Sequence, residues 1–187
     1  LKLLSELQLT NVEVYLNSIG CMECREDYLD KLKDYLTRHQ NELCDNCQDR
    51  KKRNPLRVLD CKSESCSNVI ADAPKIIDYL CDDCQEHFND VKEYLDILNI
   101  EYIVDPTLVR GLDYYTNTAF EIKYSGLGAQ DTVFGGGRYN GLAEEIGGRS
   151  VPGIGFAIGI ERLLLTLEEE GIELPIDKSI DLYITTI

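Results

Sequence analysis

The sequence of 187 residues predicts an α+β fold, in which part of an antiparallel β-sheet is interrupted by a helical insertion. Apolar and polar residues alternate in short stretches near both ends of the chain, as they do in half-buried strands. Helical periodicity replaces this alternation across residues 21–99. The connections between the later strands are short, which favours antiparallel pairing. We therefore expect one sheet domain, residues 1–20 and 100–172, the insertion, and a tail, residues 173–187.

The first elements are the end of a helix and a strand. Leu1, Leu4 and Leu7 recur at helical spacing. The alternation from Val12 to Leu16 then predicts a half-buried strand, which a turn at residues 18–20 closes.

The insertion is expected to consist of several helices. Asp72 and Pro74 indicate a helix start, because proline is tolerated in a first turn. Two apolar stripes at helical spacing predict one helix near the start of the insertion and a long one at its end. The first stripe is Cys24, Tyr28, Leu32, Tyr35 and Leu36, and the second is Cys81, Cys84, Phe88, Val91, Leu95 and Leu98.

A β-hairpin is predicted after the insertion, over residues 119–134, with its turn at residues 125–128. Gly135, Gly136 and Gly137 follow it. Three glycines allow a ligand to approach the backbone closely and permit a positive φ.

The last part of the sheet domain is expected to hold two helices and a strand. Residues 139–146 suggest a short helix. Residues 153–159 suggest a strand that runs into a second helix ending before Gly171. The core-facing residues of that helix are expected to be Ile160, Leu163, Leu164 and Leu167.

Composition limits the classes of protein. No stretch approaches the ~20 apolar residues of a membrane span, and the first residues are too polar for a secretory signal. We therefore expect a soluble, cytoplasmic protein, whose eight cysteines are thiols or metal ligands rather than disulfides. The net charge of −15 argues against nucleic acid as a partner, although binding depends on local patches.

One concentrated basic patch does occur, at Arg50, Lys51, Lys52 and Arg53. It is either a solvated helix end or a contact for a phosphate backbone.

The cysteines predict metal sites. Cys44 and Cys47, followed by Cys61 and Cys66, resemble zinc-ribbon spacing, and four thiolates can close a tetrahedral structural site. Two pairs are left, one at each end of the insertion, and they can meet as a second site: Cys21, Cys24, Cys81 and Cys84. The alternative is that the cysteines are buried thiols, which pack as small hydrophobes.

Residues 108–121 concentrate the groups that suggest a binding site. The guanidinium of Arg110 is a planar fork of donors suited to a carboxylate or a phosphate, and Tyr114 and Tyr115 offer ring faces and hydroxyls. The site would suit a small anion with a polar ring. The alternative is a surface strand in which Arg110 forms an ion pair with Asp113 or Glu121.

Three stretches, taken together, resemble a known family. They are Leu108-Val-Arg-Gly-Leu-Asp-Tyr-Tyr115, Val133-Phe-Gly-Gly-Gly-Arg-Tyr-Asn-Gly-Leu142 and Pro152-Gly-Ile-Gly-Phe-Ala-Ile-Gly-Ile-Glu-Arg-Leu163. In this order and at this spacing they are similar to the histidine-specific signatures and third class motif of histidyl-tRNA synthetases, which are class II aminoacyl-tRNA synthetases. The resemblance covers nearly the whole chain. It implies that the first two class motifs lie before Leu1, that the sheet domain is catalytic, and that residues 173–187 lead into an anticodon-binding domain through a strand at 179–184.

The resemblance also implies roles and ligands. The reaction joins histidine to ATP and then to tRNA(His), and charge develops on the α-phosphate, where Arg110 would stabilise it. Magnesium would accompany ATP, with protein ligands outside this chain. Histidine would be held by Arg110, Tyr114, Tyr115, Gly135, Gly136, Gly137 and Tyr139, and ATP by Arg162, Gly155, Gly159 and Glu161. The basic patch would lie near the tRNA, and the parent would be a homodimer.

Two other functions stay open. One is a non-catalytic, synthetase-like regulatory subunit of histidine biosynthesis, which need not keep the reactive arginine. The other is a zinc-dependent interaction module, in which the insertion is the functional part.

Overall fold

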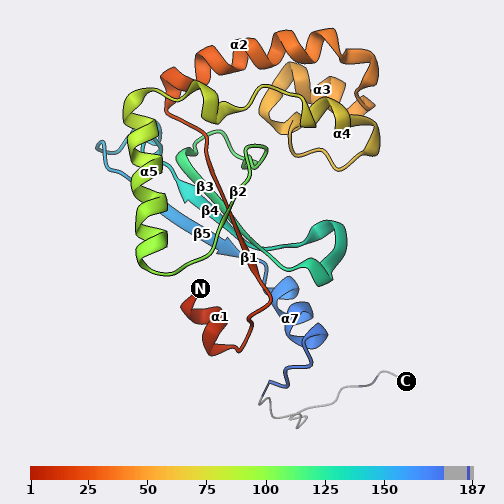
Figure 1. The fold of residues 1–187 in the computed structure, drawn as a ribbon, viewed down its shortest axis with the longest axis vertical. Helices are drawn as coiled ribbons and strands as arrows, with labels where there is room; N and C mark the ends of the chain where they lie inside the picture. The colour runs from red at the N-terminus through yellow and green to blue at the C-terminus, as the bar shows by residue number, and fades with distance from the viewer. Residues whose placement is uncertain (175–184, 186–187) are drawn as a thin grey trace.

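The computed structural model describes residues 1–174 and Thr185, apart from the side chains of Ala129 and Gln130. Its centre is a five-stranded sheet in the order β2-β1-β3-β4-β5 (Figure 1). Neighbouring strands are antiparallel except β1 and β2, which are parallel. The predicted α+β class is therefore confirmed. The strands are β1 (Glu13–Ser18), β2 (Ile103–Val104), β3 (Thr116–Lys123), β4 (Thr132–Arg138) and β5 (Ile154–Ile158).

Helices fill the interval between β1 and β2. Helices α2 to α4 gather beyond one end of the sheet, and α5 runs alongside it (Figure 1). These helices are α2 (Met22–Arg38), α3 (Asp45–Arg53), α4 (Glu64–Ala71) and α5 (Asp82–Ile97). Short 3₁₀ segments connect them: η1 (Gln40–Glu42), η2 (Pro55–Val58) and η3 (Ile76–Tyr79).

The other helices belong to the sheet domain. Helices α1 (Lys2–Glu6) and α7 (Ile160–Glu169) lie at the end of the molecule opposite α3 and α4 (Figure 1). Helix α6 (Leu142–Glu145) follows β4, and η4 (Ser125–Gln130) joins β3 to β4. No described helix is long and apolar enough to cross a membrane.

Two hydrophobic cores organise the described residues. The larger one joins α2 and its neighbours to the loop before β3, and it contains the fully buried Tyr28, Leu32 and Leu36 of the predicted stripe. The smaller one packs α1 and α7 on the sheet through Leu4, Ile122, Phe134, Leu163 and Leu167. The first core therefore extends from the insertion to the Arg110-containing segment.

The strand register determines which residues share a sheet face. Cross-strand partners point to the same face, and Tyr15 pairs with Glu121, which pairs with Gly135. The adjacent row contains Ala119, Gly137 and Gly155. One face of the sheet thus carries a polar row beside a row of very small residues.

Some expectations about single elements were wrong. Asp72 ends α4 instead of starting a helix, and only the short η3 follows Pro74. Ile160 and Leu164 are 58% and 47% exposed, because Leu163, Thr166 and Leu167 form the buried side of α7. On α5 only Cys84 and Phe88 are buried, and Leu98 is 65% exposed.

The glycine run and the chain end also differ from expectation. Gly135, Gly136 and Gly137 lie inside β4, and none of them has a positive φ. Close approach does occur, but by groups of the protein itself, Arg110, Tyr115 and the backbone of β5, and the approach of a ligand stays a prediction. The helix expected over 139–146 is limited to α6. The strand expected at 179–184 lies outside the described residues.

Candidate active site

The segment before β3 is anchored on the sheet by buried polar groups. The Asn17 side chain, on β1, donates to the carbonyl oxygens of Leu108 at 2.9 Å and Pro106 at 3.3 Å. The Asp105 carboxylate accepts from the backbone N–H of Thr107 at 2.9 Å and from its hydroxyl at 2.6 Å. These bonds fix the segment that leads to Arg110. We call residues 108–115 the histidine loop, after the histidine-specific family signature that they resemble.

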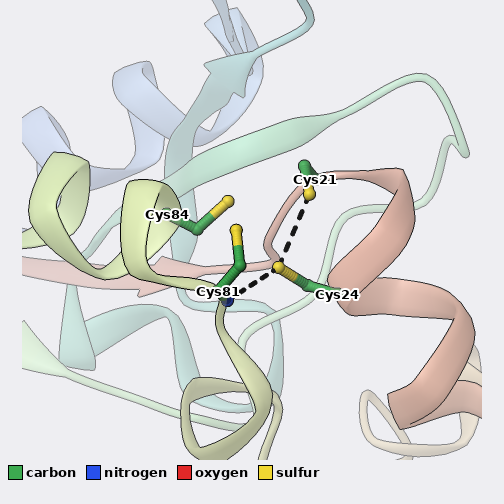
Figure 2. Close-up of side chains that lie close together, drawn as sticks. All are labelled: Cys21, Cys24, Cys81 and Cys84. Atoms are coloured by element: carbon green, nitrogen blue, oxygen red, sulfur yellow. Dashed lines mark hydrogen bonds between the residues drawn. The ribbon is translucent and has the colours of Figure 1, made fainter.

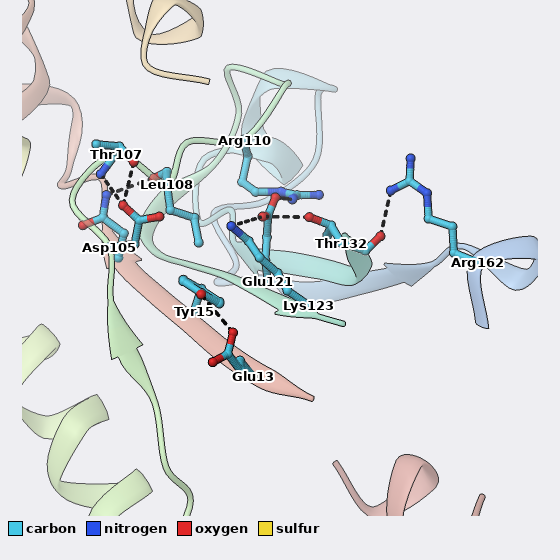
Figure 3. Close-up of polar contacts among 11 residues, drawn as sticks. Glu13, Tyr15, Asp105, Thr107, Leu108, Arg110, Glu121, Lys123, Thr132 and Arg162 are labelled. Atoms are coloured by element: carbon cyan, nitrogen blue, oxygen red, sulfur yellow. Dashed lines mark hydrogen bonds and ion pairs between the residues drawn. The ribbon is translucent and has the colours of Figure 1, made fainter. Parts of the chain in front are cut away.

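A chain of polar contacts links the two arginines that the sequence selected (Figure 3). Arg110 Nη1 lies 2.5 Å from Glu121 Oε1, and the Thr132 hydroxyl donates to Glu121 Oε2 at 3.0 Å. Arg162 Nη1 donates to the Thr132 carbonyl at 2.7 Å. Lys123 Nζ is 3.8 Å from Glu121 Oε2. The ion pair considered as the alternative for Arg110 is therefore present, with Glu121 as its partner.

Gly135 lies directly beneath the Arg110 guanidinium. A Cβ added at Gly135 would lie 2.5 Å from Arg110 Nη1 and 2.6 Å from Nη2, closer than real Cβ atoms come to other groups. Arg110 Nε is buried and has no hydrogen-bond partner among the described residues. The guanidinium is thus held flat above the sheet.

Three tyrosine rings pack beside Arg110. The Tyr114 and Tyr115 rings stack with centroids 4.8 Å apart, and the Tyr139 ring meets them edge-on at 5.8 and 6.2 Å. Gly137 and Gly155 make room, since a Cβ would lie 2.9 Å from Tyr115 Cδ1 and 2.5 Å from the Tyr139 hydroxyl, respectively. Burial and a hydrogen bond to Tyr115 raise the pKa of Tyr114, which keeps its hydroxyl protonated.

The residues assigned to ATP do not all lie together. Arg162, at the start of α7, lies against Gly159, where a Cβ would be 3.4 Å from its Cδ. Glu161 is exposed in the first turn of α7. Gly155 contacts Tyr139 and so belongs with the tyrosine cluster. Gly136 meets the backbone of β5, which it pairs with through Phe156.

The insertion contacts the histidine loop through residues that the sequence did not single out. Arg25, buried in α2, donates to the carbonyl oxygen of Asp113 at 3.0 Å and to that of Tyr115. Burial lowers the pKa of the Arg25 guanidinium. Asn54 donates to the Asp113 carboxylate at 2.5 Å. A signal for Arg25 existed, because Arg25, Tyr28, Leu32 and Leu36 share one helix face.

Glu121 was named only as a salt-bridge partner, although it occupies the centre of the polar chain. The sequence pattern that could have indicated its position is the strand alternation, which places Glu121 on the same sheet face as Ala119 and Lys123. The predicted surface strand would have exposed Glu121. In the structure its side chain is only 17% exposed, because Arg110 covers it.

Both sets of four cysteines come together, with all four sulfurs of each set within 4.8 Å of one another. We call Cys44, Cys47, Cys61 and Cys66 the insertion cluster, and Cys21, Cys24, Cys81 and Cys84 the junction cluster (Figure 2). All eight are free thiols, and Cys24, Cys47, Cys66 and Cys84 are buried.

Within the insertion cluster, backbone donors point at sulfurs. The N–H of Cys44 donates to Cys66 Sγ at 3.3 Å, and that of Ser63 to Cys61 Sγ at 3.5 Å. A backbone hydrogen bond from Cys47 lowers the pKa of Cys44, whereas burial raises the pKa of Cys47.

The basic patch forms the last turn of α3, where positive charge complements the helix dipole. Lys52 and Arg53 are exposed. Arg50 donates to the carbonyl of Arg57 at 3.1 Å, and Lys51 to the Gln40 side chain at 3.3 Å. Half of the patch is thus committed to local contacts, and the other half faces solvent.

The mostly antiparallel sheet is part of the fold of class II aminoacyl-tRNA synthetases. The histidyl-tRNA synthetase family model matches residues 4–163, so the chain belongs to that family. The crystal structure of apo S. aureus histidyl-tRNA synthetase superimposes with a TM-score of 0.69 at 43% identity, covering 96% of this chain and 44% of that one.

Two bacterial relatives are more similar in sequence. The histidine–tRNA ligase of Halothermothrix orenii is 66% identical over 187 residues, which are 100% of this chain and 45% of that protein. That of Caldanaerobacter subterraneus is 59% identical over 185 residues, 99% of this chain and 44% of that protein. The chain therefore spans less than half the length of these relatives.

Proposed function

We propose that the protein containing this chain is a histidine–tRNA ligase, which activates histidine with ATP and transfers it to tRNA(His). The relatives that cover the whole chain carry that name. The observation that carries the proposal is the polar chain from Arg110 through Glu121 and Thr132 to Arg162. This polar chain holds two guanidinium groups close to the start of β4, where they would bind the phosphates of a nucleoside triphosphate.

Arg110 is the catalytic residue in this proposal. When the histidine carboxylate attacks the α-phosphorus, negative charge grows on the phosphate oxygens, and a fixed guanidinium stabilises it. Glu121 and Gly135 hold Arg110 flat, so that its guanidinium would meet the incoming anion in a fixed orientation. Arg162 would bind the nucleotide from the start of α7, together with Gly159 and Glu161.

Histidine would bind beside the tyrosine cluster. Tyr114, Tyr115 and Tyr139 present hydroxyls and ring edges, and the glycines of β4 form the floor beneath them. Hydrogen bonds to both imidazole nitrogens would reject apolar amino acids strongly, because unmet buried polar groups are costly.

The domain assignment is part of the same proposal. Residues 1–20 and 100–172 belong to the catalytic domain, residues 21–99 to the insertion, and residues 173–187 to the connection with an anticodon-binding domain. Supporting it, α2 to α5 all lie between β1 and β2. Magnesium accompanies ATP, the enzyme is a homodimer, and its location is cytoplasmic, where translation uses charged tRNA. The basic patch contacts tRNA.

The insertion cluster binds structural zinc. Its sulfurs Cys44 Sγ and Cys61 Sγ are 3.8 Å apart, matching the ~3.8 Å edge of a tetrahedron with Zn–S bonds of ~2.3 Å. The cluster lies in the hydrophobic core of the helices, where buried thiolates need such a partner.

Histidine-dependent exchange of pyrophosphate into ATP, measured on the full-length protein, tests the activity. Exchange with histidine and none with other amino acids is expected, followed by charging of tRNA(His). Histidine binding without exchange would contradict the ligase and support the regulatory subunit. Zinc content without histidine binding would support the interaction module.

A further inference from the structure

We propose that the junction cluster binds a second zinc ion, which fastens the two ends of the insertion to each other and positions the histidine loop. The metal site stands on the cysteine geometry alone. Its effect on histidine rests on the proposed function. Cys21 and Cys24 open α2, and Cys81 and Cys84 open α5, so the ion would connect the first and last helices of the insertion (Figure 2).

The cysteine geometry suits four thiolate ligands. In both pairs the first cysteine is the N-cap residue and the second lies in the first helical turn. Cys21 Sγ and Cys24 Sγ are 3.5 Å apart, close to the ~3.8 Å edge of a zinc tetrathiolate and far beyond a disulfide bond of ~2.05 Å. Gly20, at φ +64°, leaves room for the turn, since a Cβ there would lie 2.8 Å from Cys24 Cβ.

Several groups around the cluster can stabilise negative charge on the sulfurs. The backbone N–H of Cys81 donates to Cys24 Sγ at 3.0 Å, and the Asn117 side chain donates to Cys84 Sγ at 3.4 Å. The positive N-terminal ends of two long helices meet at the cluster. Each thiol would lose its proton to solvent as its sulfur binds zinc, leaving a net charge of −2 that the buried Arg25 guanidinium, within electrostatic reach of Cys21 and Cys24, offsets in part.

An ion can reach the cluster. Cys21, Cys81 and Cys84 line a surface pocket together with three exposed acids, Glu23, Asp83 and Glu144. Carboxylates at the opening of a pocket raise the local concentration of cations. The four cysteines are partly or wholly buried, as in closed structural zinc sites.

The cluster is coupled to the histidine loop through two residues. Arg25, next to Cys24, holds the carbonyl oxygens of Asp113 and Tyr115. Asn117, bonded to Cys84, has a φ of 51° and sits at the bulge that starts β3, where its backbone exchanges hydrogen bonds with Gly20 and Ile19. Fixing the helix ends therefore fixes the position of the tyrosines relative to Arg110.

Metal counting on the full-length protein tests the site. Mass-spectrometric metal analysis should find one zinc fewer per chain in Cys81→Ser/Cys84→Ser than in the wild type, and also one fewer in the matched Cys61→Ser/Cys66→Ser variant. An unchanged zinc count in Cys81→Ser/Cys84→Ser would overturn the proposal. If that variant does not fold, the Cys61→Ser/Cys66→Ser protein decides, because it should still take up one cobalt(II) with the absorption of a tetrahedral thiolate site. Failure to take up cobalt would be equally decisive against it.

The positioning role has its own measurement. Histidine affinity, measured calorimetrically, should fall on the order of 10-fold or more in Cys81→Ser/Cys84→Ser, because small displacements of binding groups are costly. An Arg25→Met variant should show the same loss with its zinc count unchanged. Normal histidine affinity in the zinc-depleted variant would overturn the positioning role, whereas absence of ligase activity in the wild type would count against the proposed function and leave the metal count intact.

Discussion

Because Gly135 has no side chain, the Arg110 guanidinium can lie directly against β4. Arg110 lies flat because nothing projects from the strand beneath it. We expect Gly135→Ala to push the guanidinium away and to lower the rate of histidyl-adenylate formation by about 10- to 100-fold. Gly141→Ala is the control, since a Cβ there meets nothing within 4 Å and the rate should not change. Equal rates of adenylate formation in Gly135→Ala and Gly141→Ala would show that the reaction does not require the flat placement of Arg110 over Gly135.

Glu121 connects Arg110 to Thr132 and is the second residue whose removal should matter. In Glu121→Ala, Arg110 loses its 2.5 Å partner, so we expect slower adenylate formation and little change in histidine affinity. Glu121→Gln keeps an acceptor and should recover part of the rate. Thr132→Val removes only the 3.0 Å bond and should have a smaller effect. A Glu121→Ala enzyme with a normal rate but a raised KM for histidine would reassign Glu121 to substrate binding.

For single residues, the chemistry of a side chain was easier to predict than the partners that it contacts. Arg110 and Tyr114 stand out by residue type, and Glu121 was one of two partners considered for Arg110, but no local pattern selects Glu121 over Asp113. Arg25 was hidden for a similar reason: its partners, the carbonyl oxygens of Asp113 and Tyr115, are far from it in sequence. The roles of Arg110 and Tyr114 in ligand binding stay predictions.

Among the elements, α3 carries the tRNA prediction. Lys52 and Arg53 are exposed, so replacing both with Glu should weaken tRNA binding. The slope of the logarithm of the binding constant against the logarithm of salt concentration should fall by roughly one for each lost phosphate contact. Histidine-dependent pyrophosphate exchange should not change. Lys2→Glu in α1, at the opposite end of the molecule, is the control (Figure 1). Salt dependence identical to that of wild type would leave the patch as a solvated helix end.

The insertion cluster gives a second prediction for the elements. If zinc holds α3, η2 and α4 together, a chelator should first raise amide hydrogen exchange in residues 44–70 and only later in β3 and β4. The reason is that β3 and β4 pair along their length, whereas these helices are short. Simultaneous loss of protection in both regions, or no loss at all, would argue against a zinc site there.

The sequence predicted elements with strong periodicity and missed those that tertiary contacts define. Strand β1 and the stripe of α2 follow from alternation and helical spacing. The glycines of β4 were expected to follow the hairpin and to permit a positive φ, whereas they lie inside the strand, where glycine is unfavourable unless another group approaches closely. Here Arg110 and Tyr115 make that approach. On α7, Leu163 and Leu167 are buried as predicted, but Thr166 completes the buried side, and Ile160 and Leu164 face outward.

For the whole molecule, the insertion and the sheet are linked at the site itself. The larger core runs from α2 to the histidine loop, and Asn54 and Arg25 contact Asp113 directly. No periodicity in the sequence predicts that link, since it joins residues about 60 to 90 positions apart. If the proposed function holds, the insertion supports histidine binding and also offers a surface for tRNA.

In the proposed function, Arg110 stabilises the transition state of histidine activation. Single-turnover formation of histidyl-adenylate by the full-length protein tests it most directly, comparing wild type with Arg110→Ala, Arg110→Lys and the exposed control Arg149→Ala. We expect Arg110→Ala to lose roughly 3 kcal/mol of transition-state stabilisation, about a hundredfold in rate, with histidine affinity nearly unchanged. Lysine should rescue poorly because a point charge cannot replace the fork, and Arg149→Ala should match wild type. An Arg110→Ala enzyme that forms adenylate at the wild-type rate would contradict the catalytic role of Arg110.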